Sequence, residues 1–264
     1  YSMLYIEKKN PSHSTRRELA RIKTSPEWRA ISEGDTKAIR DQFDKLDKSI
    51  IRPDLLIEQH HLCAYCMRRI SDHGQSTHIE HWEPLNKNKD KALDYNNFLG
   101  VCDGGAGVEV SGKRILSCDA NKSKTDGKDD IERLTLNPHD RLMMSGITYT
   151  RKGFIKFQNP GPYDNDTCQK ISDELNYILQ LNGKLDRDGE FLQDTATQIV
   201  KGRKDAFENA ELIIQILDRK HRLTSHNLAQ EIQRLENKPI RDQYVGVTLF
   251  RLHRKLKSLI AQGL

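Results

Sequence analysis

The feature that most constrains this chain is a set of four cysteines in its first half. Cys63 and Cys66 form a Cys-x-x-Cys pair, and Cys102 and Cys118 follow with 15 residues between them. Two thiolates at Cys-x-x-Cys spacing can hold one ion from a tight turn, and a second pair completes a structural zinc site. The wide gap in the second pair is tolerable, because the cost of loop closure grows slowly with length. The sequence therefore predicts a structural Zn²⁺ held by all four cysteines; the alternative is that Cys102 and Cys118 are ordinary buried thiols.

Composition and charge set wide limits on the function. The chain has 264 residues, of which 36% are hydrophobic and 31% charged, and its net charge is +5. A charge of this size permits a polyanionic partner without requiring one. No apolar run approaches the roughly 20 residues that cross a bilayer, and the first residues lack the charged and apolar regions of a signal peptide. We therefore expect a cytoplasmic protein without a membrane partner.

The hydrophobic pattern predicts an α+β fold that is predominantly α-helical. Apolar residues recur at helical spacing over residues 36–47, and Pro53 is typical of the first turn of a second helix, over 54–60. Residues 148–150 and 154–157, joined across Gly153, predict a hairpin. An apolar seam near the end of the chain predicts a packed helix, through Val245, Leu249, Leu252, Leu256 and Leu259. We expect four regions: an N-terminal helical arm (1–60), a core rich in cysteine and histidine (61–130), a hairpin and linker (131–165) and a C-terminal helical region (166–264).

The segment 77–85 carries the residues best suited to chemistry. Glu80 and His81 are adjacent there, and His78 and Glu83 lie within three residues of them. Hydrolysis of a phosphodiester needs a cation to stabilise the developing charge and a base to deprotonate water. A carboxylate next to an imidazole offers both, and an asparagine oxygen can complete the shell of Mg²⁺. The segment therefore predicts metal-assisted phosphodiester hydrolysis.

Three motifs in order resemble those of HNH (ββα-metal) endonucleases. The stretch 80–85, Glu-His-x-x-Pro-Leu, is similar to the opening motif of that family. The stretch 95–102 looks like its central Asn-Leu segment, which leads to a zinc cysteine, and 118–124 looks like its closing motif with a final Asn and a Lys three residues on. The resemblance implies a two-stranded ribbon carrying His81 and a following helix carrying Asn121, clasped by zinc.

The resemblance also implies a role for each site residue. His81 would be the general base, Glu80 and Asn121 would ligate a catalytic Mg²⁺ or Mn²⁺, and Asn97 would hold the loop beside His81 through backbone hydrogen bonds. Asn96 competes with Asn97, which fits the spacing to Cys102 better. His78 is a second candidate: on a strand it would share a face with Glu80 and could assist the metal or contact phosphate, or it could be a surface histidine.

A longer resemblance covers most of the chain and points to a biological setting. Residues 3–6, 63–66, 79–81, 136–138 and 179–182 look like the PtuB family, the HNH component of Septu and retron-associated anti-phage systems. The chain departs from the pattern at the wide gap from Cys102 to Cys118 and at Glu80, where the family has Asp. The resemblance implies a defence nuclease that cleaves nucleic acid, DNA in preference to RNA. Its partners would be an ABC-type ATPase of the PtuA kind and, in retron systems, an RNA–DNA assembly. The alternative is an inactive, zinc-stabilised nucleic-acid-binding or scaffold subunit.

Overall fold

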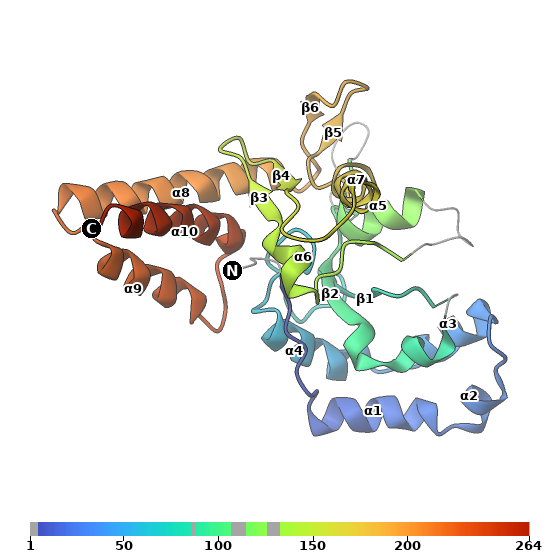
Figure 1. Ribbon diagram of the computed structural model, residues 1–264. Coiled ribbons are helices and arrows are strands. Elements are labelled where there is room, and N and C mark those ends of the chain that lie inside the picture. Colours follow the sequence, from blue (N-terminus) through green and yellow to red (C-terminus); the bar gives the residue numbers. More distant parts are fainter. Residues whose placement is uncertain (1–4, 86–87, 107–114, 126–132, 264) are drawn as a thin grey trace.

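The computed structural model describes residues 5–85, 88–106, 115–125 and 133–263 (Figure 1). The fold is α+β: about half of the chain is helical, and the strands form three separate two-stranded antiparallel sheets within the described residues. The predicted fold class is confirmed at this level. In the described part of the chain, every helix is too short or too polar to cross a lipid bilayer.

Four N-terminal helices form a small apolar core that borders the candidate site. They are α1 (His13–Lys23), α2 (Pro26–Ala30), α3 (Thr36–Asp44) and α4 (Lys48–Glu58). Side-chain oxygens of Ser12, Ser25, Asp35 and Asp47 cap their first turns, which satisfies backbone N–H groups that a helix leaves open. The prediction for the fourth helix was wrong at its start: α4 begins after the Asp47 cap, so Pro53 lies inside the helix.

The middle of the chain forms an antiparallel ribbon with one helix beside it. Strand β1 (Thr77–His81) pairs with β2 (Phe98–Cys102), and two short 3₁₀ turns connect them, η1 (Lys89–Leu93) and η2 (Tyr95–Asn97). Helix α5 (Cys118–Thr125) contacts β2. Most of the predicted insertion between Cys102 and Cys118 falls on residues 107–114, outside the described residues. The order of elements is therefore strand, strand, helix, with candidate residues on each.

Two hairpins and an irregular helix follow. After α6 (Arg141–Ser145), β3 (Ile147–Tyr149) pairs with β4 (Ile155–Phe157), which confirms the predicted hairpin; Gly153 turns the chain with φ +87°. Helix α7 (Asn165–Asp173) continues into η3 (Glu174–Ile178), a stretch of π-helix. A second hairpin, β5 (Lys184–Leu185) with β6 (Phe191–Gln193), interrupts the region expected to be helical.

The last three helices form an arm in which α10 lies between its neighbours (Figure 1). They are α8 (Ile199–Arg219), α9 (Ser225–Glu236) and α10 (Val245–Ala261). The predicted seam packs: Val245, Leu249, Leu252 and Leu259 of α10 are buried. Arg251 bridges to Glu211 of α8 at 2.6 Å. The segment before α10 contacts the turn that follows Cys63 and Cys66, because the N–H of Tyr244 donates to the carbonyl of Met67.

Candidate active site and metal centre

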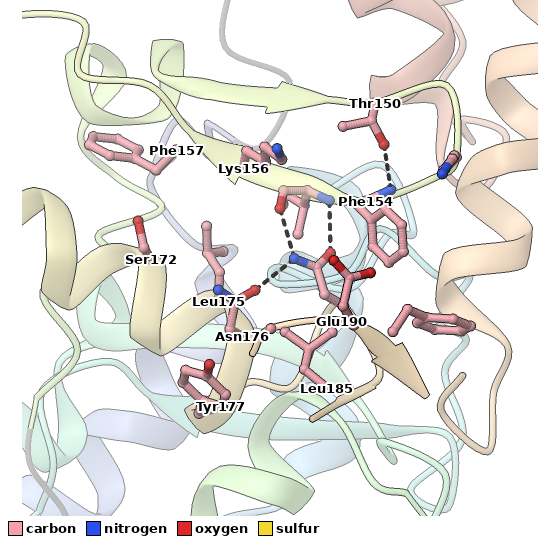
Figure 2. Close-up of a pocket in the computed structure, with 15 residues that line it drawn as sticks. Thr150, Phe154, Lys156, Phe157, Ser172, Leu175, Asn176, Tyr177, Leu185 and Glu190 are labelled. Carbon is pink, nitrogen blue, oxygen red and sulfur yellow. Dashed lines mark hydrogen bonds between the residues drawn. The ribbon is translucent and has the colours of Figure 1, made fainter. Parts of the chain in front are cut away.

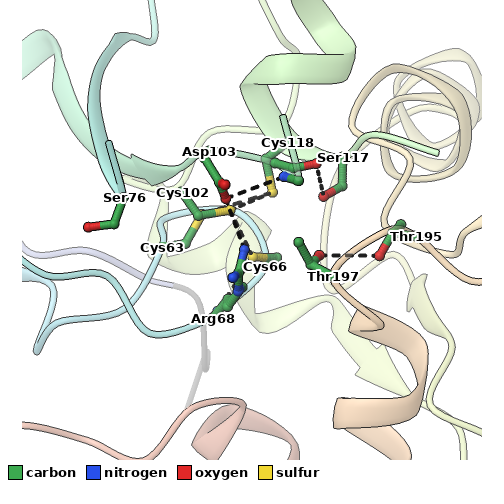
Figure 3. Close-up of polar contacts among 12 residues, drawn as sticks. Cys63, Cys66, Arg68, Ser76, Cys102, Asp103, Ser117, Cys118, Thr195 and Thr197 are labelled. Atoms are coloured by element: carbon green, nitrogen blue, oxygen red, sulfur yellow. Dashed lines mark hydrogen bonds and ion pairs between the residues drawn. The ribbon is translucent and has the colours of Figure 1, made fainter. Parts of the chain in front are cut away.

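The four cysteines meet in one buried cluster (Figure 3). Their Sγ atoms all lie within 4.8 Å of one another, and each residue is at most 2% exposed. Three of the sulfur–sulfur distances are 3.9 Å for Cys63–Cys118, 3.7 Å for Cys66–Cys102 and 3.8 Å for Cys102–Cys118. A zinc–sulfur bond of about 2.3 Å in a tetrahedron corresponds to a sulfur–sulfur distance of about 3.8 Å. The cluster therefore has the size of a four-thiolate site and could hold a structural metal such as zinc.

Local backbone geometry explains how distant cysteines converge. Cys63 and Cys66 sit in a tight turn in which the N–H of Met67 donates to the carbonyl of Cys63 and the N–H of Arg68 contacts Cys66 Sγ at 3.4 Å. Cys102 ends β2. Cys118 begins α5 with φ +55°, and its N–H donates to the carbonyl of Leu179. Cys63 and Cys66 thus come from one local turn, whereas β2 supplies Cys102 and α5 supplies Cys118.

One positively and one negatively charged side chain form an ion pair at the edge of the cysteine cluster. Arg68 forms an ion pair with Asp103 at 2.9 Å, next to Cys102 in Figure 3. Burial, together with the neighbouring Cys102 thiol, raises the pKa of Cys66 well above its ordinary value. Cys63 differs: burial alone would raise its pKa, but hydrogen bonds from the other three thiols lower it well below the ordinary value. The Cys66 thiol therefore keeps its proton at neutral pH, and a cation that binds it would release that proton.

His81 is held in a defined orientation beside the ribbon. Its ring makes edge contacts with Phe43 of α3 and Phe98 of β2, at centroid distances of 4.5 and 5.1 Å. Nε2 lies 3.0 Å from the carbonyl oxygen of Ala92, and because a carbonyl only accepts, Nε2 carries the proton. Burial lowers the pKa of His81 to about 4. At neutral pH the ring is therefore uncharged, and Nδ1 is the nitrogen that can accept a proton.

Glu80 points into a small charged cluster formed with α5. Lys122 donates to Glu80 Oε1 at 2.6 Å, and the side chain of Lys122 is only 3% exposed. Burial, followed by the nearby negative charge of Asp119, raises the pKa of Glu80 to about 8, although Lys122 opposes the shift. Asp119 and Lys122 are three residues apart on α5 and so share a face of the helix. Two carboxyl groups share one buried ammonium, so Glu80 tends to keep its proton at neutral pH, and a divalent cation could take the place of that proton.

A buried hydroxyl lies in the same electrostatic environment. Tyr65, between the first two cysteines, is 1% exposed, and among the described residues its hydroxyl has no hydrogen-bond partner. Its pKa is raised well above the ordinary value by burial first, and then by the charges of Glu80 and Asp119. A polar atom left unpaired at this place fits a site that gains a ligand, because buried polar groups normally have partners.

Asn97 secures the loop that follows His81. Its Nδ2 donates to the carbonyls of Glu83 and Lys91 at 2.9 and 3.0 Å, and its Oδ1 accepts from the N–H of Glu83 at 2.7 Å. The loop between those residues ends next to Ala92, whose carbonyl orients His81. Asn97 is buried, whereas the competing Asn96 is exposed. The contacts are those expected of a residue that holds the loop beside the histidine.

Two other candidates, Asn121 and His78, make contacts that leave their predicted roles as predictions. The Nδ2 of Asn121 donates to the carbonyls of Tyr177 and Ile178, both at 2.9 Å, which attaches α5 to η3. Asp119, two residues earlier, lies near Glu80 instead. The signal for Asp119 was present in the sequence, since it directly follows Cys118 and precedes Lys122 by three residues. His78 is exposed on β1, opposite Val101, and its predicted role remains a prediction.

The arrangement brings an oriented neutral imidazole and a carboxylate cluster to one end of a short ribbon. Adjacent strand residues point to opposite faces, so Glu80 and His81 present their groups to different neighbours, α5 and α3 respectively. A carboxylate is a common cation ligand and a neutral imidazole is a common base, so the two side chains offer both kinds of group at the end of β1. Comparison with models of known protein families and with curated proteins finds no match for this chain.

Proposed function

We propose that this chain is a metal-dependent endonuclease of the HNH type. The observation that carries the proposal is the geometry of His81: a buried, uncharged ring whose Nε2 is committed to the Ala92 carbonyl, next in sequence to a buried carboxylate paired with α5. The resemblance of three motifs to HNH enzymes supports it, and so does the order of strand, strand and helix around a four-cysteine cluster.

His81 is the general base in this proposal. With Nε2 donating to Ala92, Nδ1 takes the proton of the attacking water. A pKa of about 4 leaves the base deprotonated at neutral pH without further activation, although it also makes it a weak base. The packing against Phe43 and Phe98 prevents the ring from turning, so the accepting nitrogen keeps its direction. Asn97 acts indirectly, because it fixes the loop that ends at Ala92, whose carbonyl orients His81.

Glu80 and Asp119 are the residues that would hold the catalytic Mg²⁺ or Mn²⁺. Bound there, the cation would stabilise negative charge on the phosphate and its leaving oxygen. Lys122 donates to Glu80, and with a cation on that carboxylate its ammonium would become available to a phosphate oxygen. We propose Asp119 in place of Asn121 because Asp119 lies close enough to Glu80 for its negative charge to raise the pKa of that carboxyl, whereas the Nδ2 of Asn121 is directed at carbonyls of η3. The four cysteines would hold Zn²⁺ and fix the start of α5 relative to β2.

The wider setting follows from the resemblance alone. We propose that the substrate is nucleic acid, DNA in preference to RNA, and that the chain serves an anti-phage complex with an ABC-type ATPase. One observation favours a different function, a zinc-stabilised scaffold or binding subunit without activity. Lys122 binds Glu80 directly at 2.6 Å, as a site that had lost its activity would allow.

Incubation with nucleic acid separates the two functions. The protein, alone and with its genetic neighbours, is incubated with supercoiled phage DNA and with total RNA in Mg²⁺ or Mn²⁺. The nuclease proposal predicts cation-dependent cleavage that His81→Ala abolishes, with the zinc content unchanged. Binding without cleavage under all these conditions would favour the scaffold.

A further inference from the structure

A groove opens between three elements that lie outside the ribbon and its helix (Figure 2). The hairpin β3–β4 forms one wall, α7 with η3 forms the second, and the hairpin β5–β6 forms the third. Its volume is about 670 Å³, which falls in the range of roughly 300–1,000 Å³ typical of ligand sites. The groove is large enough for one or two nucleotide units.

Hydrogen bonds fix the residues at the bottom of the groove. Asn182 exchanges two hydrogen bonds with the backbone of Ile155, at 2.8 and 2.9 Å, and also donates to Asn176 at 2.7 Å. The guanidinium of buried Arg203 donates to the carbonyl of Leu181, the residue before Asn182. Across the groove, the rings of Phe154 and Phe191 meet at 5.5 Å. The walls are therefore held in place, so a ligand would find a preformed site.

Aromatic rings and lysines occur together along this groove. Tyr177 and Phe191 line it and are 49% and 41% exposed, so a large part of each side chain is open to a ligand. Lys152 and Lys156 are exposed on the hairpin β3–β4 side, and Glu190 is on the opposite side. Stackable rings next to cations are what single-stranded nucleic acid requires, since bases stack on the rings while lysines follow the phosphates.

The groove is also connected to the candidate active site. Tyr177 belongs to η3, and its carbonyl accepts a hydrogen bond from Asn121 of α5 at 2.9 Å. The same helix carries Asp119 and Lys122. Stretches of π-helix are rare and occur often at functional sites. The wall that presents Tyr177 is thus attached to the helix that presents Lys122.

We propose that this groove binds a single-stranded segment of the nucleic-acid substrate, next to the cleavage site. The inference rests on the proposed nuclease function and adds a preference for unpaired strands. The bases stack on Tyr177 and Phe191, and the backbone runs along Lys152 and Lys156. Glu190, on the far wall, keeps the phosphates on the lysine side.

Binding is measured by fluorescence anisotropy with the full chain carrying His81→Ala, so that the probe stays intact in Mg²⁺. The probes are a labelled 20-nucleotide DNA, an RNA of the same sequence and the corresponding duplex. We expect the single strands to bind more tightly than the duplex. Adding Tyr177→Ala or Phe191→Ala weakens single-strand binding about tenfold, and Tyr177→Phe retains it because the ring remains.

Two matched controls test whether the groove itself is responsible. Leu192→Ala removes an equally exposed apolar side chain (55%) from the same strand, β6, outside the groove, and leaves binding unchanged. Replacing both Lys152 and Lys156 with Gln lowers the salt slope of binding by about 1.4, since each phosphate contact on a single strand contributes about 0.7. Lys220→Gln, at the far end of α8, leaves the slope unchanged.

The results separate this inference from the proposed function. Equal binding by Tyr177→Ala, Phe191→Ala and their His81→Ala parent overturns the groove, even where the wild-type protein cleaves. Competition by free mononucleotides as strong as that of the 20-nucleotide strand overturns it as well. Loss of binding in the ring variants, with no cleavage by any version of the protein, supports the groove and refutes the nuclease.

Discussion

Replacement of Asn97 by alanine offers a quantitative test of how the base is positioned. The side chain makes three hydrogen bonds to the loop after His81, two to carbonyls and one from an N–H. Each such bond contributes about 0.5–1.5 kcal/mol, and groups left unpaired in a buried place cost more. The change should therefore destabilise the protein by about 2–4 kcal/mol and lower the melting temperature by roughly 5–15 °C. It should also lower the rate of cleavage, because the Ala92 carbonyl that orients His81 lies at the end of that loop.

The assay combines urea denaturation with cleavage measured well below the melting temperature. Asn96→Ala is the matched control, because Asn96 is the exposed neighbour of Asn97 and its loss should change neither quantity. Asn97→Asp keeps the acceptor for the N–H of Glu83 but turns an oxygen toward two carbonyls, so it should resemble alanine. Wild-type stability and wild-type cleavage in Asn97→Ala would refute the idea that this residue holds the loop.

Three further predictions follow from the metal sites. Purified protein should carry about one zinc per chain, and Cys118→Ser should lose both zinc and fold, because the affinity of such sites contributes about 10–16 kcal/mol in small domains; Cys168→Ser, which changes a cysteine outside the cluster, should keep both. Asp119→Asn should raise the Mn²⁺ concentration needed for cleavage more than tenfold, whereas Asn121→Ala should lower thermal stability and leave that concentration unchanged; the reverse pattern would restore Asn121 as the ligand. Because the pKa of Glu80 is raised to about 8, a cation must displace a proton below that pH. Cation affinity measured by calorimetry should therefore rise up to about tenfold per pH unit between 6 and 8 and level off above, and an affinity that is constant over this range would contradict the placement of Glu80 in the site.

Several features could be predicted because their signals are local. The Cys-x-x-Cys pair defines its own turn, and Gly153 between two apolar runs defines its own hairpin. The seam from Val245 to Leu259 buries one face of α10, as its spacing requires. In each case the residues that carry the signal also make the contacts, so sequence spacing was sufficient.

Other features could not be predicted, because the spacing of residues does not show which of two local signals determines the structure. Pro53 is a common first-turn residue, but the side chain of Asp47 accepts from the N–H of Ser49 and starts α4 earlier. Asp188 and Gly189 are a typical turn pair, yet the strands beside them are short and mostly exposed, so the hairpin β5–β6 lacked a hydrophobic pattern.

The choice between Asp119 and Asn121 illustrates the limit most clearly. Both follow Cys118 closely, and both residue types suit a cation site. The different contacts of Asp119 and Asn121 depend on the direction in which α5 presents each side chain once Cys118 has started the helix with φ +55°. That direction follows from the four-cysteine cluster and from packing on η3, which are long-range contacts. The directions of these two side chains could therefore not be predicted from the sequence alone.

The most direct test of the central claim compares cleavage by the wild-type protein and by His81→Ala. Both proteins are purified with their zinc content measured and are incubated with supercoiled DNA and with RNA in Mg²⁺ or Mn²⁺, with and without the neighbouring ATPase. We expect cleavage by the wild-type protein, at least in the presence of the ATPase, and a loss of at least about a hundredfold in His81→Ala, with zinc content and melting temperature retained. Cleavage by His81→Ala at the wild-type rate would contradict the account.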